Sequence, residues 1–425
     1  MSTERLTEGI KAGGTALLVA LFISAVACAA DWPQLGGPGR DARSPEQNVI
    51  QQWPENGPEV LWTIDVGEGY AAPSVYDGKV YLLDRDPGKR DILRCLSLRT
   101  GEELWTNSWE AKGGVPHPGS RSQPLVGQRY VFAVGAKGDL YAVDRDGGRL
   151  LWHVNLLEQY DARQPKYGVS QCPLSYRDMI IVIPFGQEAG VAALDKETGR
   201  EVWASAPFED LKRGPYSSPV FATIDGTRQV VVNVFARTAG LDPETGEFLW
   251  GHGGWRCKRT IVSPVIARGG RILRTGGYEA GTQLLHVQKS DGRFEAKTAW
   301  KTSECNCQIH QPIIYRGYIY VMGNSNQSKG GLMCYDIDGA LQWQTGRSPN
   351  FGRGGMVLAN GRLFAVNART GELVLIRPDP SGYSPLGSEK YLDPEARAWA
   401  PPVLSEGRLL IRDQHQMKCL DVRKR

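Results

Sequence analysis

The chain has 425 residues, 41% of them hydrophobic and 23% charged, with a formal net charge of +4 at pH 7. The hydrophobic content and the twelve tryptophans are ample for a buried core. The mild charge, with no zinc-finger or RNA-recognition motif, gives no basis for a nucleic-acid partner.

The N-terminal segment, residues 1–30, has the features of an export signal. An apolar run from Ala12 to Ala30 follows Arg5 and Lys11 and ends in small residues. This pattern predicts a signal peptide cleaved near Ala29 or Ala30, or a membrane anchor where it is not cleaved. The residues around Cys28 loosely resemble a bacterial lipobox, so lipid anchoring at Cys28 is an alternative. We therefore expect an exported protein of the periplasm or cell envelope, associated with a membrane only through this segment.

Residues 31–58 form a Gly- and Pro-rich leader that carries Trp32 as an anchor. We expect this leader to run along the surface of the folded domain or across one of its faces. Whether it enters a central channel is open at this stage.

Residues 59–425 are built from a repeat with a period of 43–51 residues. Each unit contains short apolar strands, a strand ending in Asp, a Thr-Gly or Asp-Gly turn and a final strand with a large ring. A period in the forties with several short strands per unit is typical of a β-propeller blade. The recurring rings are expected to wedge neighbouring blades together. They are Trp62, Trp105, Trp152, Trp203, Trp250, Trp300 and Trp343.

The innermost strand of each unit is expected to begin at a proline, where no backbone N–H is required. Eight such starts are visible, and the seventh lacks the proline. In that unit Ile376 takes the place of the closing tryptophan, so we count eight blades, with seven as the runner-up. The starts are Ala72-Pro73, Gln123-Pro124, Cys172-Pro173, Ser218-Pro219, Ser263-Pro264, Gln311-Pro312, Gly355-Met356 and Pro401-Pro402.

The two ends of the repeat region complement each other. The last unit stops at Val422 without a closing Trp strand, and the first has a spare strand, Glu59-Val-Leu-Trp62, before it. We expect this N-terminal strand to complete the eighth blade and so close an all-β ring. Closure removes open sheet edges, and we expect a monomer.

The best copies of the repeat are Ala193-Leu-Asp-Lys-Glu-Thr-Gly-Arg-Glu-Val-Trp203 and Gly240-Leu-Asp-Pro-Glu-Thr-Gly-Glu-Phe-Leu-Trp250. They resemble the pyrroloquinoline-quinone-type (PQQ) repeat family, over about residues 59–425. That family includes quinoprotein alcohol dehydrogenases and the propeller lipoprotein of the outer-membrane assembly machinery. The resemblance implies the fold and says little about activity.

The dehydrogenase branch of this family implies a quinone held with Ca²⁺, an Asp base and adjacent cysteines under the cofactor. This chain has no Cys-Cys pair, and Cys305-Asn-Cys307 is the nearest match. No inner-strand Asp is placed as the base. We therefore expect no cofactor and no metal, with PQQ and Ca²⁺ only under the alternative reading.

The cysteines fall into two groups. Cys95, Cys334 and Cys419 occupy matching strand positions and are expected to be small buried hydrophobic residues, whereas Cys172, Cys257, Cys305 and Cys307 precede or begin inner strands. In an oxidising compartment Cys257 could pair with Cys305 or Cys307 of the next blade, although connectivity is beyond the sequence.

The loops that enter the innermost strands of a closed propeller crowd around its axis at one face. Here these loops are rich in basic and aromatic residues and poor in carboxylates, which suits an anionic ligand. The candidate ligand-binding residues are Tyr70, His117, Arg121, Gln123, Tyr167, Gln171, Tyr216, Lys258, Arg259, His310, Arg353 and Trp399.

No catalytic constellation is readable: there is no Ser-His-Asp spacing, phosphate loop or metal triad. The sequence favours an exported, non-catalytic propeller that binds an envelope protein or a small anionic ligand. A PQQ-dependent dehydrogenase is the first alternative. A carbohydrate-binding propeller, with the mouth aromatics as stacking platforms, is the second.

Overall fold

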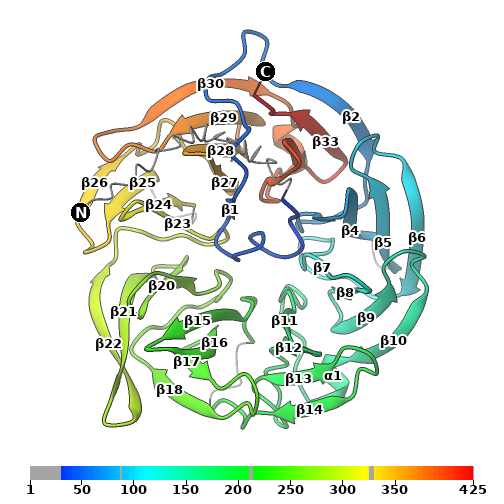
Figure 1. Cartoon of the computed structure of the whole chain (residues 1–425), viewed down its shortest axis with the longest axis vertical. Coiled ribbons are helices and arrows are strands. Elements are labelled where there is room, and N and C mark those ends of the chain that lie inside the picture. Colours follow the sequence, from blue (N-terminus) through cyan, green and yellow to red (C-terminus); the bar gives the residue numbers. More distant parts are fainter. Residues whose placement is uncertain (1–29, 87–88, 210–213, 325–329, 425) are drawn as a thin grey trace, which may run out of the picture.

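A computed structural model describes residues 30–86, 89–209, 214–324 and 330–424. These residues form a ring of eight antiparallel sheets around an axis, and the fold is an eight-bladed β-propeller (Figure 1). The predicted signal segment, including Cys28, lies outside the described residues, apart from Ala30. Within the described ranges, no helix has the length and apolar character needed to cross a bilayer.

Blades 1–4 each contain four strands, ordered from the axis outward. Blade 1 is β3 (Ser74–Tyr76), β4 (Lys79–Asp86), β5 (Arg90–Ser97) and β6 (Glu103–Glu110). Blade 2 is β7 (Leu125–Val126), β8 (Tyr130–Val134), β9 (Asp139–Asp144) and β10 (Leu150–Asn155). Blade 3 is β11 (Leu174–Tyr176), β12 (Met179–Val182), β13 (Ala192–Asp195) and β14 (Glu201–Ala204). Blade 4 is β15 (Val220–Ile224), β16 (Thr227–Val234), β17 (Arg237–Leu241) and β18 (Phe248–His252).

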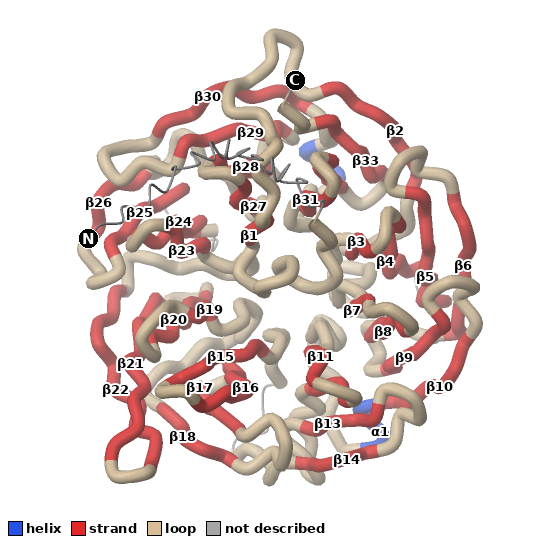
Figure 2. Tube along the Cα trace, viewed as in Figure 1, coloured by secondary structure: helices blue, strands red, loops and turns tan. Residues whose placement is uncertain are grey.

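Blades 5–8 complete the ring. Blade 5 is β19 (Val265–Ile266), β20 (Arg271–Gly276), β21 (Gly281–Ser290) and β22 (Arg293–Thr302). Blade 6 is β23 (Ile313–Tyr315), β24 (Tyr318–Gly323), β25 (Gly331–Asp336) and β26 (Leu341–Gln344). Blade 7 is β27 (Met356–Ala359), β28 (Arg362–Asn367), β29 (Glu372–Arg377) and β30 (Ser384–Lys390), with β1 (Arg43–Ser44) added at its axial edge. Blade 8 is β31 (Val403–Ser405), β32 (Arg408–Arg412) and β33 (Gln416–Asp421), with β2 (Glu59–Asp65) outermost. Helical structure in the described ranges is limited to α1 (Leu156–Gln159) and one 3₁₀ turn, Pro394–Ala396 (Figure 2).

The predicted inner strands and the predicted closure are both confirmed. In blades 1–6 and 8 the innermost strand begins within one residue of the predicted start, and in blade 7 so does β27, to which β1 is added on the axial side. Strand β2 pairs antiparallel with β33, with Trp62 opposite Cys419, so the N-terminal strand completes the last blade. The ring therefore closes through hydrogen bonds between the two ends of the repeat region.

The recurring tryptophans join neighbouring blades, as expected, through a specific hydrogen bond. Each indole N–H except that of Trp250 donates to a backbone carbonyl in the next blade, as Trp62 does to Leu98 (3.0 Å) and Trp152 to Lys196 (2.9 Å). Trp250 instead donates to Gln229 of its own blade at 2.6 Å. The reason is that the β21–β22 hairpin of blade 5 is ten residues long on each side, which moves its turn away from Trp250.

The glycine of the Thr-Gly turn is needed for more than its backbone angle. Gly246 has φ +75°, and a Cβ atom there would lie 2.3 Å from Cε3 of Trp203 in the preceding blade. The turn glycine therefore makes room for the ring that seals the blade interface.

We predict that Gly246→Ala lowers the free energy of unfolding by about 2–4 kcal/mol, because a positive-φ penalty adds to an overpacked ring contact. The control is Gly226→Ala, at φ +79° in a turn where nothing lies within 4 Å of the new Cβ. Gly226→Ala should lower the free energy of unfolding only by the positive-φ penalty, about 1 kcal/mol. Urea unfolding of the two variants measures the difference, and equal losses would contradict the ring-contact argument.

One sequence expectation for blade 7 is wrong. Ile376 lies on the third strand, opposite Pro385, and does not replace the closing tryptophan. The register places Gly387 opposite Leu375, where the other blades have Trp, and Trp53 of the leader covers Gly387. A Cβ atom at Gly387 would meet Trp53 Cγ at 2.3 Å, so the leader supplies the missing ring.

The disulfide expectation is also not met. All seven described cysteines are free thiols and buried, including Cys257, Cys305 and Cys307. As predicted, Cys95, Cys334 and Cys419 are buried at matching strand positions; the structure places them on the third strands, opposite Trp105, Trp343 and Trp62.

Candidate functional site

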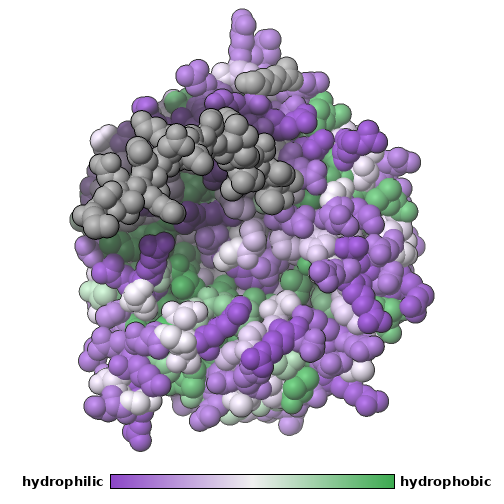
Figure 3. Space-filling view, viewed as in Figure 1, coloured by the Kyte–Doolittle hydropathy of each residue, from purple (hydrophilic) through white to green (hydrophobic). Residues whose placement is uncertain are grey.

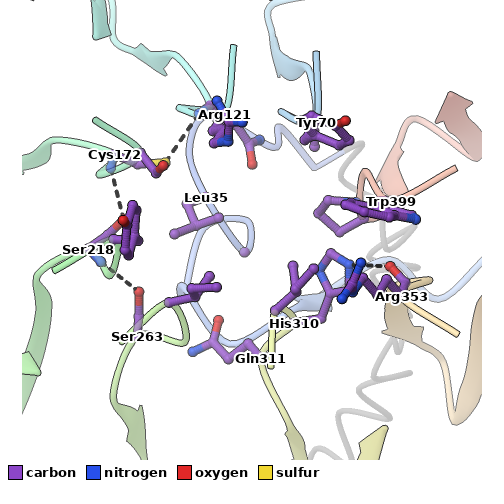
Figure 4. A pocket seen from close by; sticks show the side chains of 18 of the residues that line it. Leu35, Tyr70, Arg121, Cys172, Ser218, Ser263, His310, Gln311, Arg353 and Trp399 are labelled. Atoms are coloured by element: carbon purple, nitrogen blue, oxygen red, sulfur yellow. Dashed lines mark hydrogen bonds between the residues drawn. The ribbon is translucent and has the colours of Figure 1, made fainter. Parts of the chain in front are cut away.

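The loops that enter the innermost strands converge at one end of the axis and enclose a cavity of about 220 Å³ (Figure 4). A cavity of about 150 Å³ is enough for benzene, so this one has room for a substituted ring. The opposite face of the ring, which carries the leader in Figure 1, is largely hydrophilic, with scattered hydrophobic residues (Figure 3).

Most of the predicted ligand-binding residues meet in this cavity. The residues from that prediction that line it are Tyr70, His117, Arg121, Gln123, Tyr167, Tyr216, Arg259, His310, Arg353 and Trp399.

Two predicted residues do not line the cavity. Gln171 is buried and makes two hydrogen bonds with the backbone of Ile183, so it holds a loop of blade 3. Lys258 is exposed beside Arg259 and is not among the lining residues.

The leader forms part of the cavity wall. This answers the question, left open by the sequence, of whether the leader enters the central channel. Trp32, Leu35, Gly36 and Ala42 line the cavity, and Leu35 projects into it in Figure 4. The leader contacts opposite sides of the ring: β1 pairs with β27 of blade 7, whereas the side chain of Arg40 donates to the carbonyl of Pro173 in blade 3. Residues 32–44 therefore cross the axial channel.

Arg40 fixes this crossing. Its guanidinium donates to the backbone carbonyls of Pro173 and Pro219, at the starts of blades 3 and 4, and its own carbonyl accepts from Gln311 of blade 6. Only 5% of Arg40 is exposed, and desolvation lowers its pKa to about 10. A buried cation held by peptide dipoles thus ties the leader to three blades.

Aromatic rings and guanidinium groups alternate around the mouth. Arg353 lies 4.5 Å from the centroid of the Trp399 ring, Arg121 5.3 Å from that of Tyr70, and Arg259 5.5 Å from that of Tyr167. Tyr70 and Trp399 are in contact with each other, at 5.1 Å between centroids. Stacked guanidinium and aromatic groups hold each other in fixed orientations.

The cavity is positively charged. None of its lining residues is a carboxylate. The guanidinium of Arg121 donates to the backbone carbonyls of Pro116, His117 and Gly119, and burial lowers its pKa to about 10. Within the described ranges neither Arg121 nor Arg259 has a carboxylate within 4 Å. An anion in the cavity would therefore meet two guanidinium groups, those of Arg121 and Arg259, that no carboxylate of the described residues neutralises.

His310 faces the cavity as a neutral imidazole. Its Nε2 lies 2.9 Å from the backbone carbonyl of Arg353, and desolvation lowers its pKa to about 4. The described residues that line the cavity with His310 include no carboxylate to assist it, so they do not mark it as a general base.

We predict that His310 makes the fold acid-sensitive. The folded-state pKa of His310 lies below the unfolded value of about 6.5. The contribution of the neutral imidazole to the free energy of unfolding is therefore complete above pH 6.5 and is lost as the pH falls toward 4. The unfolding free energy should drop by about 1–3 kcal/mol across this window. Urea titrations at pH 7 and pH 4.5 measure the drop, and His310→Gln should reduce it. An unchanged drop in this variant would assign the effect to other groups.

The site also contains residues that the sequence did not indicate. Tyr278, Gln308, Cys172, Ser218 and Ser263 line the cavity together with the leader residues. The serines and Cys172 directly precede the inner-strand prolines, so their place at the axis follows from the repeat once the blades are aligned.

The geometry defines the class of protein: an eight-bladed β-propeller with a cationic, aromatic cavity at one end of its axis. The chain belongs to the family described as outer membrane protein assembly factor BamB, whose family model matches residues 46–163 and 187–377.

Relatives with different names are about equally similar to the chain. It is 26% identical over 284 residues to the quinoprotein alcohol dehydrogenase PedH of Pseudomonas putida, a match that covers 62% of this chain and 44% of PedH. It is 32% identical over 163 residues to the assembly factor BamB of Kangiella koreensis, covering 37% of each protein. The chain thus spans less than half the length of these two relatives.

Solved structures show the same fold. The quinohemoprotein alcohol dehydrogenase of Comamonas testosteroni superimposes with a TM-score of 0.64 at 15% identity, covering 94% of this chain and 82% of that one. BamB of Moraxella catarrhalis gives 0.59 at 14% identity, covering 85% and 97%.

Proposed function

We propose that this protein is an exported, non-catalytic binding propeller of the cell envelope whose axial cavity takes a small anionic ligand with a planar ring. The observation that carries the proposal is the lining itself, in which Arg121, Arg259 and Arg353 alternate with aromatic rings and no carboxylate takes part. Export and an envelope location are supported by the N-terminal sequence and by the names of the BamB relatives.

Each part of such a ligand has a matching group in the cavity. A carboxylate can accept paired hydrogen bonds from a guanidinium, and a ring can lie against Tyr70, Tyr167 or Trp399. Gln123 is 2% exposed, and its side-chain carbonyl Oε1 has no hydrogen-bond partner in the described structure. Gln123 can therefore accept from an N–H or O–H on the ligand.

The quinoprotein alternative was tested against the residues present. Calcium takes six to eight oxygen ligands, usually including carboxylates. No carboxylate lines this cavity, and the described residues contain no cluster of three His, Cys, Asp or Glu side chains that could hold a metal ion. The residues thus do not fit a calcium-bound quinone, and we derive no reaction from one.

The experiment is a thermal-shift titration of the purified protein with matched compounds. Benzoate and benzene-1,2,4-tricarboxylate carry ring and charge, benzamide carries the ring alone, tricarballylate the charge alone, and glucose neither. Specific binding raises the melting temperature with ligand concentration. We expect shifts with the aromatic carboxylates only. A shift of equal size with benzamide, or with glucose alone, would overturn the anionic-ligand proposal.

A parallel titration with pyrroloquinoline quinone, with and without Ca²⁺, tests the dehydrogenase alternative. Calcium-dependent binding together with dye-linked alcohol oxidation would replace the non-catalytic proposal.

A further inference from the structure

The inner strands of blades 2–5 are joined by a ladder of hydrogen bonds next to the cavity. The backbone N–H of Gln123 donates to Cys172 Sγ at 3.2 Å, that of Cys172 to Ser218 Oγ at 2.8 Å, and that of Ser218 to Ser263 Oγ at 2.9 Å (Figure 4). Each side chain in the ladder precedes an inner-strand proline. Cys172 therefore occupies a position that the two following blades fill with serine.

We propose that Cys172 is a reactive thiol that forms mixed disulfides with small anionic disulfides entering the axial cavity. Of the seven described cysteines, Cys172 is the one that lines this cavity. The sulfur of Cys172 accepts a hydrogen bond from the backbone N–H of Gln123. The guanidinium of Arg40 donates to the carbonyl of Pro173, the residue that follows Cys172. Only 2% of Cys172 is exposed, and the cavity that it lines gives a reagent a path to this residue, on which thiol–disulfide exchange depends.

A second observation indicates that the cavity receives a ligand beside Cys172. Gln123, whose backbone donates to the sulfur, also lines the cavity, is 2% exposed and has an unpartnered Oε1. A buried acceptor without a partner is costly unless a bound molecule supplies a donor. The thiol and the unpartnered carbonyl thus lie on the same wall.

All seven described thiols are buried, and Cys172 differs from the other six in lining the cavity. Burial raises the pKa of Cys95, Cys257, Cys305 and Cys334 to about 11 and that of Cys419 to about 12, and it raises the pKa of Cys307 well above its ordinary value. None of these residues lines the cavity. They serve as internal controls because they should react slowly in the folded protein.

The reaction is a thiol–disulfide exchange. Cys172 loses its proton to solvent, and its sulfur attacks one sulfur of the incoming disulfide. A new Sγ–S bond forms as the S–S bond of the reagent breaks, and the leaving thiolate carries away the electron pair. Cys172 is oxidised to a mixed disulfide, and half of the reagent is reduced to a thiol.

The test uses two aromatic disulfides of opposite design on the folded protein. The reagent 5,5′-dithiobis(2-nitrobenzoate) is anionic, and 4,4′-dithiodipyridine is neutral. Released thiol gives the rate, and intact mass with peptide mapping gives the site. We expect one equivalent of reagent to add at Cys172. The labelling rate of the anionic reagent, divided by its rate with free cysteine, should exceed that of the neutral reagent on the order of tenfold.

Cys172→Ser is the matched variant, because serine retains the acceptor that Ser218 and Ser263 provide in the same ladder. It should fold normally and lose the fast phase. Labelling spread over other cysteines, or labelling of Cys172 only in denaturant, would overturn the proposal.

Arg121→Gln separates the reactive thiol from the anionic-ligand function. The preference for the anionic reagent rests on that function, whereas reactivity of the thiol does not. Arg121→Gln should lower the ratio of the anionic rate to the neutral rate, because it removes a cationic group from the cavity. If both reagents label Cys172 at equal normalised rates, the thiol is reactive and the selection of anions is refuted.

Discussion

Replacing Asp84 with asparagine is expected to lower the free energy of unfolding by about 3–5 kcal/mol, because it removes the anion from a buried ion cluster. Asp84 is fully buried on β4 of blade 1. Its carboxylate lies 3.2 Å from Arg412 of blade 8 and 2.8 Å from Arg94 of blade 1. It also accepts from the backbone N–H of Gly67 at 3.1 Å.

This cluster lies at the seam where the ring closes. Arg412 is 1% exposed and donates in addition to the carbonyls of Gly67 and Asp413. In the asparagine variant its positive charge is left in the interior, where its described partners are neutral carbonyl oxygens. Removing one member of a buried ion pair costs far more than the pair contributes when both are present.

The control for Asp84→Asn is Glu103→Gln. Glu103 pairs with the other side of Arg94 at 2.8 Å, but its side chain is 45% exposed, and such surface pairs contribute about 0–1 kcal/mol. Urea unfolding measures both variants. The double variant Asp84→Asn, Arg412→Gln should lose less than the sum of the single losses. Additive losses, or a small effect of Asp84→Asn, would show that the cluster does not hold the seam.

Much of the ring could be predicted from the sequence because its determinants repeat. A proline before each inner strand and a tryptophan in each outer strand lie within short windows whose spacing is set by the strands themselves. The same repetition placed Arg121, Arg259 and Trp399 in loops at one end of the axis, where the structure brings them together.

The errors arose where a contact joins segments remote in the sequence. Trp53 covers Gly387 across more than three hundred residues, so inspection of blade 7 alone suggested Ile376 instead. The path of the leader through the channel depends on Arg40 meeting carbonyls of two distant blades, which no local pattern indicates. Gln171 and Lys258 show a third limit: a loop position was predictable, but the direction of the side chain was not.

Two adjacent residues, Lys258 and Arg259, allow the effect of charge in the cavity on ligand binding to be separated from the effect of charge on the surrounding surface. Arg259 lines the cavity over the ring of Tyr167, whereas Lys258 is exposed and outside the lining. Both lie in one loop, so Arg259→Gln and Lys258→Gln remove the same charge from almost the same place. Any general effect of net charge on an anionic ligand must be equal in the two variants.

We expect Arg259→Gln to weaken binding of an aromatic carboxylate by about 10- to 100-fold, since a charge-assisted hydrogen bond contributes about 1.5–3 kcal/mol. Lys258→Gln should change the dissociation constant by less than about twofold at 0.15 M salt, where exposed charges are screened within about 8 Å. Isothermal titration at 0.05 and 0.5 M salt measures both constants. The loss in Arg259→Gln should persist at high salt, because a guanidinium in direct contact with the ligand is screened less than a surface ammonium. Equal losses in the two variants would mean that the cavity attracts anions only through the overall field of the loop, and the ligand would then have to bind outside it.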